Sequence, residues 1–91
     1  MFTITKLRTE LVKRGFTDVT VKPSDSPGIT FTIIAPFFTN NDITNITIDE
    51  SNNITIRREE YANFITINPK TLQLLSLLRH TVSRKDNQND H

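Results

Sequence analysis

The amino-acid sequence predicts an α+β domain: an antiparallel meander of about five strands, with an N-terminal and a C-terminal helix packed on one face. Three observations lead to this fold class. Apolar residues recur with helical spacing near both ends of the 91-residue chain, alternate with polar residues in between, and are interrupted by turn-forming residues. The length fits a single domain, which we place at residues 1–83, followed by a disordered tail at residues 84–91 that contains no apolar side chain.

The first predicted element is a short amphipathic helix near the N-terminus. Its apolar side consists of residues at helical spacing: Ile4, Leu7, Leu11 and Val12. Gly15 follows at the position where a left-handed residue ends a helix, and Phe16 is then placed to contact Leu11. The sequence therefore predicts both the helix and its end.

Two alternating runs follow this helix. Residues 18–22 and 29–34 place apolar side chains at every second position, and the turn between them contains Pro23, Pro27 and Gly28. Each run is predicted to be a strand that is buried on one side and solvated on the other.

The phrase Ile-Thr-Ile then occurs three times, at residues 46–48, 54–56 and 65–67. The copies begin eight and eleven residues apart, a spacing too irregular for a solenoid, and they are too few to stack as one. We therefore expect three further strands of the meander.

The spacing of these strands also predicts their register. The first two copies share an inner face only if the hairpin loop has an odd number of residues, namely residues 50–52 with Asn52 left-handed. The third copy needs an even loop, residues 59–62, which would place Phe64 beside Arg57 on the outer face. The same register gathers threonines on that outer face: Thr20, Thr30, Thr32, Thr47, Thr55 and Thr66.

The last element is a long helix. Asn68 is predicted to cap it, Pro69 to occupy its first turn, and Val82 to lie near its end. Its apolar side chains cover more than half the circumference, with Leu72 and Leu77 at the two edges of the stripe. Because one sheet face covers less than that, the sequence leaves two alternatives: a homodimer through this helix, in which a second copy covers Leu72 or Leu77, or a tightly wrapped monomer. The homodimer is the favoured one.

The predicted core contains the inward-facing apolar residues of all these elements. They are Leu7, Leu11, Val19, Val21, Ile29, Phe31, Ile33, Ile46, Ile48, Ile54, Ile56, Ile65, Ile67, Leu74, Leu75 and Leu78. A domain of this size needs most of its apolar side chains for one core, so we expect no large internal cavity.

The residues that catalysis or metal binding requires are few. The chain has no cysteine, and neither His80 nor His91 has a second histidine three or four positions away. The acidic pairs at residues 49–50 and 59–60 are adjacent along extended chain, where neighbouring side chains point apart. We predict no enzymatic activity, no catalytic residue, no metal site and no cofactor.

Charge and composition narrow the class of partner. The net charge of +1 lacks the basic excess that phosphate neutralisation requires, which disfavours nucleic acid as a partner. Neither a signal peptide nor a membrane-length apolar run is present, so we expect a cytoplasmic protein with no membrane partner. The abundance of isoleucine and asparagine over alanine and glycine favours an AT-rich genome, as in a Gram-positive bacterium or its phages.

The leading hypothesis is therefore a small non-enzymatic protein-interaction module of bacterial origin, encoded by a phage or mobile element. Phe37 and Phe38 lie in a polar loop, where they would form either a binding tip or a seal for the core. The alternative function is a weak nucleic-acid-binding or regulatory module that uses Arg57, Phe64 and the basic N-terminal helix, and a small hydrolase ranks last. The candidate interaction residues are Phe37, Phe38, Arg57, Phe64, Leu72 and Leu77.

Overall fold

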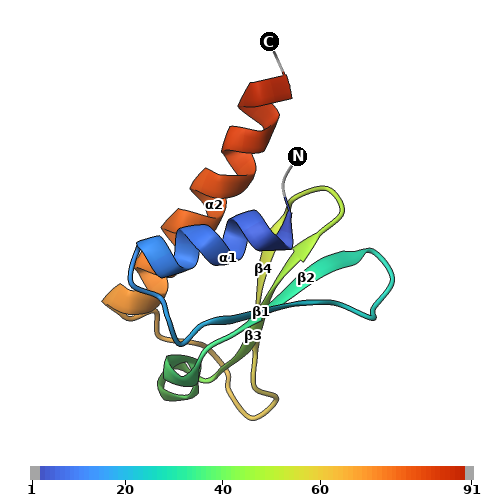
Figure 1. Ribbon diagram of the computed structural model, residues 1–91. Helices are drawn as coiled ribbons and strands as arrows, with labels where there is room; N and C mark the ends of the chain where they lie inside the picture. The colour runs from blue at the N-terminus through green and yellow to red at the C-terminus, as the bar shows by residue number, and fades with distance from the viewer. Residues whose placement is uncertain (1–2, 90–91) are drawn as a thin grey trace.

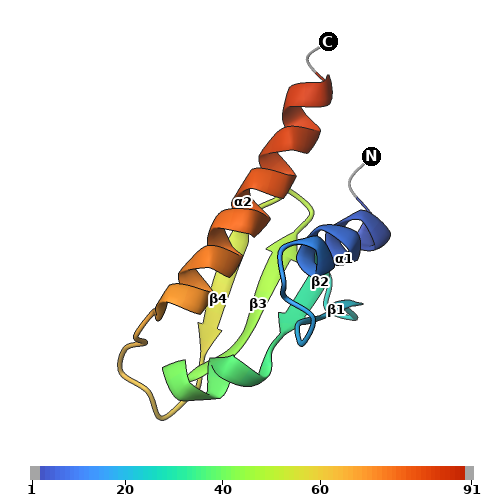
Figure 2. The ribbon, with the colours of Figure 1, turned by 60° about the vertical axis from the view of Figure 1, so that its left-hand side comes forward.

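The computed structural model describes residues 3–89, with side chains described for residues 3–82. The elements are α1 (Ile4–Lys13), β1 (Thr20–Pro23), β2 (Ile29–Ile34), the 3-10 helix η1 (Pro36–Asn41), β3 (Ile43–Asp49), β4 (Ile54–Arg58) and α2 (Pro69–Asn89). The strands form one four-stranded antiparallel sheet in the order β1-β2-β3-β4, and both α-helices lie on the same face of it (Figures 1 and 2). The predicted α+β class with two terminal helices is confirmed.

The predicted fifth strand is wrong. Residues 65–67 lie in the connection between β4 and α2, which has no strand pairing. Asn68 caps α2 by accepting a hydrogen bond from the backbone N–H of Thr71 at 2.8 Å, and Pro69 follows in the first turn, so the chain must leave any extended path here. Figure 2 shows that α2 instead runs back along β4, on the face of the sheet that also carries α1.

The predicted end of α1 is confirmed. Gly15 has φ +88°, its N–H donates to the Val12 carbonyl at 3.0 Å, and the N–H of Phe16 donates to the Leu11 carbonyl at 2.8 Å. These two bonds define a Schellman motif, in which a left-handed residue lets the chain turn back over the last helical turn. Phe16 and Leu11 are both buried, so the motif also directs Phe16 into the core.

We expect Gly15→Ala to destabilise the domain by about 1 kcal/mol, because a Cβ is disfavoured at positive φ. No atom lies within 4 Å of the Cβ position, so the loss comes from the backbone conformation and not from a clash. Urea unfolding measures it, with Lys13→Ala at an exposed position of α1 as the matched control. A loss of equal size in the two variants would contradict this account of the helix end.

The predicted β3–β4 register is also confirmed. Ile46 pairs with Ile56 and Ile48 with Ile54, the loop between the strands is residues 50–52, and Asn52 has φ +65°. A left-handed residue at this position closes a three-residue hairpin loop. The register places the isoleucines of both strands on the face toward the helices and the threonines on the opposite face.

The core contains most of the predicted residues. Those buried as predicted are Leu7, Leu11, Val21, Phe31, Ile33, Ile46, Ile48, Leu74 and Leu78. Those only half-buried are Val19, Ile29, Ile54, Ile56, Ile65 and Leu75, while Ile67 is exposed, a correction to the predicted core. Buried apolar residues that the predicted core did not include are Phe16, Ala35, Phe38, Ile43, Ala62, Leu77 and Val82. The half-burial of Ile54 and Ile56 follows from their place on β4, which forms an edge of the sheet.

The C-terminal helix is longer than the sequence pattern predicts. Its backbone continues to Asn89, whereas the apolar periodicity ends at Val82. Side chains from residue 83 onward and the whole of residues 90–91 lie outside the described part of the structure. The expectation that residues 84–91 contribute nothing to the core stays a prediction.

Candidate protein-interaction surface

The open edge of β4 exposes backbone hydrogen-bonding groups. The N–H of Asp49 donates to the Asn53 carbonyl at 3.1 Å, and the N–H of Glu59 donates to the Asp42 carbonyl at 2.9 Å. The backbone N–H and carbonyl groups of odd-numbered residues in this segment therefore point toward β3. Hydrogen-bonded pairs alternate along an antiparallel ladder, so the N–H and carbonyl groups of Ile54, Ile56 and Arg58 point away from β3. Within the described residues no strand pairs with that side of β4.

A groove runs beside this edge, between β4 and α2. Its volume is about 490 Å³, and its lining consists of aliphatic side chains from both elements together with a few polar residues. The lining residues are Asn52, Asn53, Ile54, Ile56, Leu72, Leu75, Ser76, Arg79 and Val82. The edge and the groove thus form one surface, which we call the β4–α2 groove.

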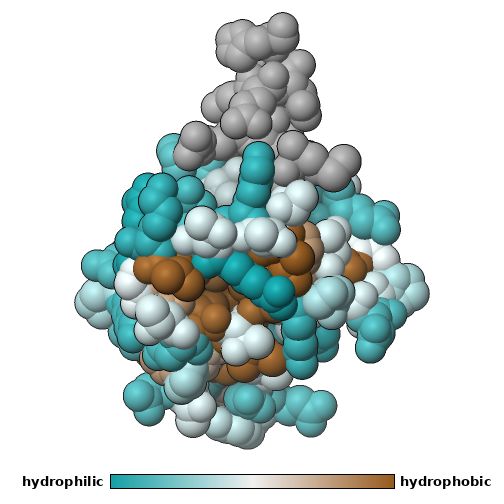
Figure 3. Space-filling view, in the orientation of Figure 1, coloured by the Kyte–Doolittle hydropathy of each residue, from teal (hydrophilic) through white to brown (hydrophobic). Residues whose placement is uncertain are grey.

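A second groove lies on the other side of α2, toward the end of α1. It has a volume of about 700 Å³ and shares Leu72 and Ser76 with the first. Its remaining lining residues are Arg14, Phe16, Gln73, Leu77 and His80. The lining of the two grooves therefore contains basic side chains and no carboxylate. In Figure 3, apolar side chains also reach the surface in patches between polar ones on the face that carries α1.

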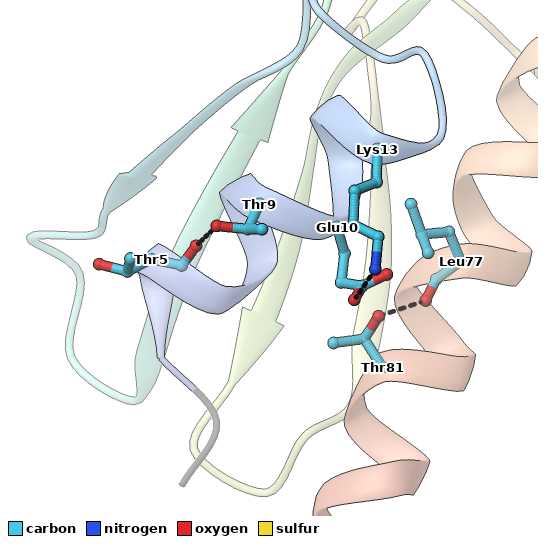
Figure 4. Close-up of polar contacts among 6 residues, drawn as sticks. All are labelled: Thr5, Thr9, Glu10, Lys13, Leu77 and Thr81. Atoms are coloured by element: carbon cyan, nitrogen blue, oxygen red, sulfur yellow. Dashed lines mark hydrogen bonds and ion pairs between the residues drawn. The ribbon is translucent and has the colours of Figure 1, made fainter.

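The structure separates the two leucines that the sequence placed at the edges of the α2 stripe. Leu77 is only 6% exposed, and Figure 4 shows it on the side of α2 that faces Glu10 and Lys13 of α1. Leu72 is 57% exposed and lines both grooves. Of the pair, only Leu72 is available to a partner, because α1 already covers Leu77.

The two phenylalanines of the polar loop are held by the core. Phe38 is 2% exposed, while Phe37 is half-buried and packs edge-to-face on it with ring centroids 5.2 Å apart. The Nζ of Lys70 lies 4.8 Å from the centre of the Phe37 ring, which links η1 to the first turn of α2. The alternative that the sequence left open is thus resolved for Phe38, which seals the core.

Arg57 and Phe64 are exposed but are not brought together by strand pairing. Arg57 lies on β4 opposite Asn45, whereas Phe64 is 75% exposed in the connection to α2, where the expected strand does not form. The register that would have aligned them on one face does not exist. The predicted nucleic-acid surface therefore loses the geometry on which it depended.

Sequence reasoning did not single out Tyr61, an exposed aromatic in the same connection. Its hydroxyl donates to the Asp42 Oδ1 at 2.9 Å, and this hydrogen bond to a carboxylate raises the pKa of Tyr61. The bond ties the connection to the end of η1, where Asp42 itself has a left-handed φ of 57°. Tyr61 carried no motif or periodicity that could have revealed this contact.

Asp49 holds the hairpin that presents β4. Its Oδ1 accepts hydrogen bonds from the backbone N–H groups of Ser51 and Asn53, each at 2.9 Å, and its Oδ2 accepts one from the Asn53 side chain. The backbone bond from Asn53 is the main reason that the pKa of Asp49 is lowered from 3.8. The charged form of Asp49 thus stabilises the loop that connects β3 and β4.

We expect the contribution of Asp49 to be lost in acid. A carboxyl whose pKa is lowered on folding stabilises the native state above its unfolded pKa, and this stabilisation disappears as the pH falls through the lower, folded pKa. Urea unfolding at neutral pH and near pH 3 should therefore show a smaller acid-induced loss in Asp49→Asn than in the wild type. The control is Asp25→Asn in the exposed β1–β2 turn. Equal acid-induced losses in wild type and Asp49→Asn would contradict this role.

The remaining features concern metal binding, the two histidines and membrane insertion. They contain no group of three or more histidine, aspartate or glutamate side chains that could hold a metal ion. His80 is exposed on α2, and His91 lies outside the described residues. None of the helices, as far as the structure describes them, is long and apolar enough to cross a membrane.

The β4–α2 groove is thus the surface on which an open strand edge, exposed apolar side chains and unpaired backbone groups coincide. No family model, no curated protein and no solved structure matches the chain. A functional assignment for this chain therefore starts from the geometry of that groove.

Proposed function

We propose that the chain is a small, non-enzymatic protein-interaction module that binds an extended segment of a partner along the open edge of β4. The carrying observation is that the free backbone groups of Ile54 and Ile56 border an apolar groove beside α2. In binding by strand addition, main-chain hydrogen bonds provide affinity and pockets for alternate side chains provide specificity. We also propose that the protein acts in the cytoplasm of a bacterium and is encoded by a phage or mobile element.

The groove fits this mode of binding. A strand added to β4 would direct every second side chain toward the helix side of the sheet, because side chains alternate across a strand. Those side chains would enter the space between Ile54 and Ile56 on one wall and Leu72 and Leu75 on the other. The module should therefore select segments with aliphatic residues at alternate positions.

The opposite edge of the sheet is blocked, which supports the choice of β4. The guanidinium of Arg8 on α1 donates to the Val21 carbonyl on β1 at 2.6 Å. Pro23, at the end of the same strand, has no N–H to offer. Proline and charged side chains are common ways in which proteins protect a sheet edge from pairing.

A peptide titration tests the proposal. The probe is a synthetic peptide with the sequence of residues 52–60, added to isotope-labelled protein, with amide chemical shifts and amide exchange as readouts. We expect shifts along β4 and α2, slower exchange at Ile54 and Ile56, and no change at Val21 on the blocked edge. Shifts confined to β1 or to the threonine face would overturn the proposal, as would the absence of binding to a monomeric sample.

A proline variant sharpens this test. Ile56→Pro removes an N–H that points away from β3, so the monomer keeps its own ladder while the added strand loses a hydrogen bond. The variant should remain folded by circular dichroism and bind the peptide at least several-fold more weakly. Thr55→Pro is the contrasting variant, because the Thr55 N–H faces β3 and its loss should destabilise the sheet itself. Undiminished binding of the peptide to folded Ile56→Pro would argue against strand addition at β4.

A further inference from the structure

We infer that the segment bound at β4 is β4 of a second copy, paired antiparallel about a two-fold axis that passes beside Ile56. This inference rests on the proposed function, since it assigns the occupant of the same edge. It also changes the basis of the predicted homodimer, from the helix alone to the strand edge with the helix beside it.

The register of this pairing follows from the backbone. The outward groups belong to Ile54, Ile56 and Arg58, and a two-fold beside Ile56 sets these three residues opposite Arg58, Ile56 and Ile54 of the second copy. Every outward group then meets a complementary one, because the pairs that face each other are all of the hydrogen-bonding type. A two-fold beside Ile54 would leave Arg58 without an opposite strand residue, since β4 begins at Ile54.

Charge selects the same register. A two-fold beside Arg58 would set two guanidinium groups directly opposite each other, and like charges opposed across strands are destabilising. With the axis beside Ile56, Arg57 lies opposite Thr55 of the second copy on the outer face, so no two like charges are opposed. The favoured register is therefore the one that the hydrogen-bonding groups also require.

The ends of the groove add a complementary pair. Arg79 lines the groove together with Asn52 and Asn53. In the Ile56 register, the turn that follows β4 of the second copy brings Glu60 toward Asn52 on the helix side of the sheet, whereas Glu59 lies toward the outer face. The second copy thus brings a carboxylate toward a groove whose own lining contains none, and the two-fold repeats this arrangement at the other end.

The helices provide the contact area that the strands lack. A stable interface buries about 800 Å² on each partner, more than one short strand edge supplies. The two-fold keeps both α2 helices on the same face of the enlarged sheet, where they flank the new strand pair. The exposed Leu72 and the half-buried Leu75 border the β4–α2 groove that this arrangement closes. The wide apolar stripe of α2 then has a partner on its β4 side as well as on its α1 side.

The test changes the residue that the register places opposite Arg57. Thr55→Glu creates two Glu–Arg pairs across the dimer, and Thr55→Arg creates two Arg–Arg pairs. We expect the dimer dissociation constant, measured by sedimentation equilibrium, to fall about fivefold in the first variant and to rise about fivefold in the second. Thr55 is exposed, so both variants should fold. Thr20→Glu and Thr20→Arg, on the exposed outer face of β1, are the matched controls and should leave dissociation unchanged.

Three outcomes would overturn the inference, and they differ in what they leave standing. A chain that stays monomeric at all concentrations, yet binds the peptide of residues 52–60 along β4, leaves the proposed function intact. A monomer that does not bind the peptide removes both. The third outcome is a dimer whose dissociation constant is unchanged by both Thr55 variants but which dissociates when Leu72 is replaced by glutamate. Such a dimer would be formed by α2 alone.

Discussion

Leu77→Glu is expected to unfold the domain, whereas Leu72→Glu is expected to leave it folded. Leu77 is 6% exposed between α2 and α1, so a carboxylate there would lose most of its hydration in an apolar contact between the two helices. The cost should be about 4 kcal/mol or more, which is most of the stability of a domain of this size. At position 72, which is 57% exposed, the same change meets solvent.

Far-UV circular dichroism and urea unfolding distinguish the two variants. The Leu77 variant should show little native helix signal at neutral pH, while the Leu72 variant should keep the native helix signal and unfold cooperatively. The pair is matched because the same substitution is made five positions apart on one helix. A folded Leu77→Glu with wild-type stability would mean that α1 does not cover this side of α2.

Phe38→Ala should cost about 3–5 kcal/mol, the usual range for truncating a fully buried phenylalanine. Phe38 is among the largest fully buried side chains, and its removal leaves a cavity at the end of the core where η1 precedes β3. Phe37→Ala should cost less, because the Phe37 ring is only half-buried and has the Lys70 Nζ 4.8 Å from its centre. Denaturant unfolding of the two variants gives the comparison. Equal losses would show that the neighbouring rings share the sealing role.

Local features were predictable because the residues that cause them are adjacent in the sequence. The Schellman motif at Gly15, the cap at Asn68 and the three-residue hairpin loop with left-handed Asn52 each involve a few consecutive positions. In each case the side chain or its absence determines the backbone conformation directly. Such features hold whatever the rest of the chain does.

The failed fifth strand shows where this kind of reasoning stops. Residues 54–56 and 65–67 both have the sequence Ile-Thr-Ile, yet only residues 54–56 form part of a strand. The preference of isoleucine and threonine for strands depends on neighbouring strands and burial. Residues 54–56 pair with β3, whereas residues 65–67 pair with no strand. The three residues alone therefore do not determine whether a neighbouring strand is available to pair with them.

The candidate surface was predictable only in part. The helical periodicity identified Leu72 and Leu77 together at the edges of one stripe, but it carried no information on which edge α1 would cover. The open edge of β4 and its groove depend on the order of the strands, which is a property of the assembled sheet. Strand order follows from long-range packing, so the residues of β4 gave no sign that they would end the sheet.

The contact between Arg8 and the Val21 carbonyl has a consequence for how far assembly can proceed. If both edges of the sheet accepted strands, β1 of one copy could join β4 of the next, and such head-to-tail addition would grow into an open filament. Because Arg8 and Pro23 block pairing at β1, only the β4 edge of the described sheet can accept a strand from another chain. In the proposed dimer, growth would therefore terminate at two chains, and a sequence rich in isoleucine and threonine would be kept from continuing into a cross-β fibre.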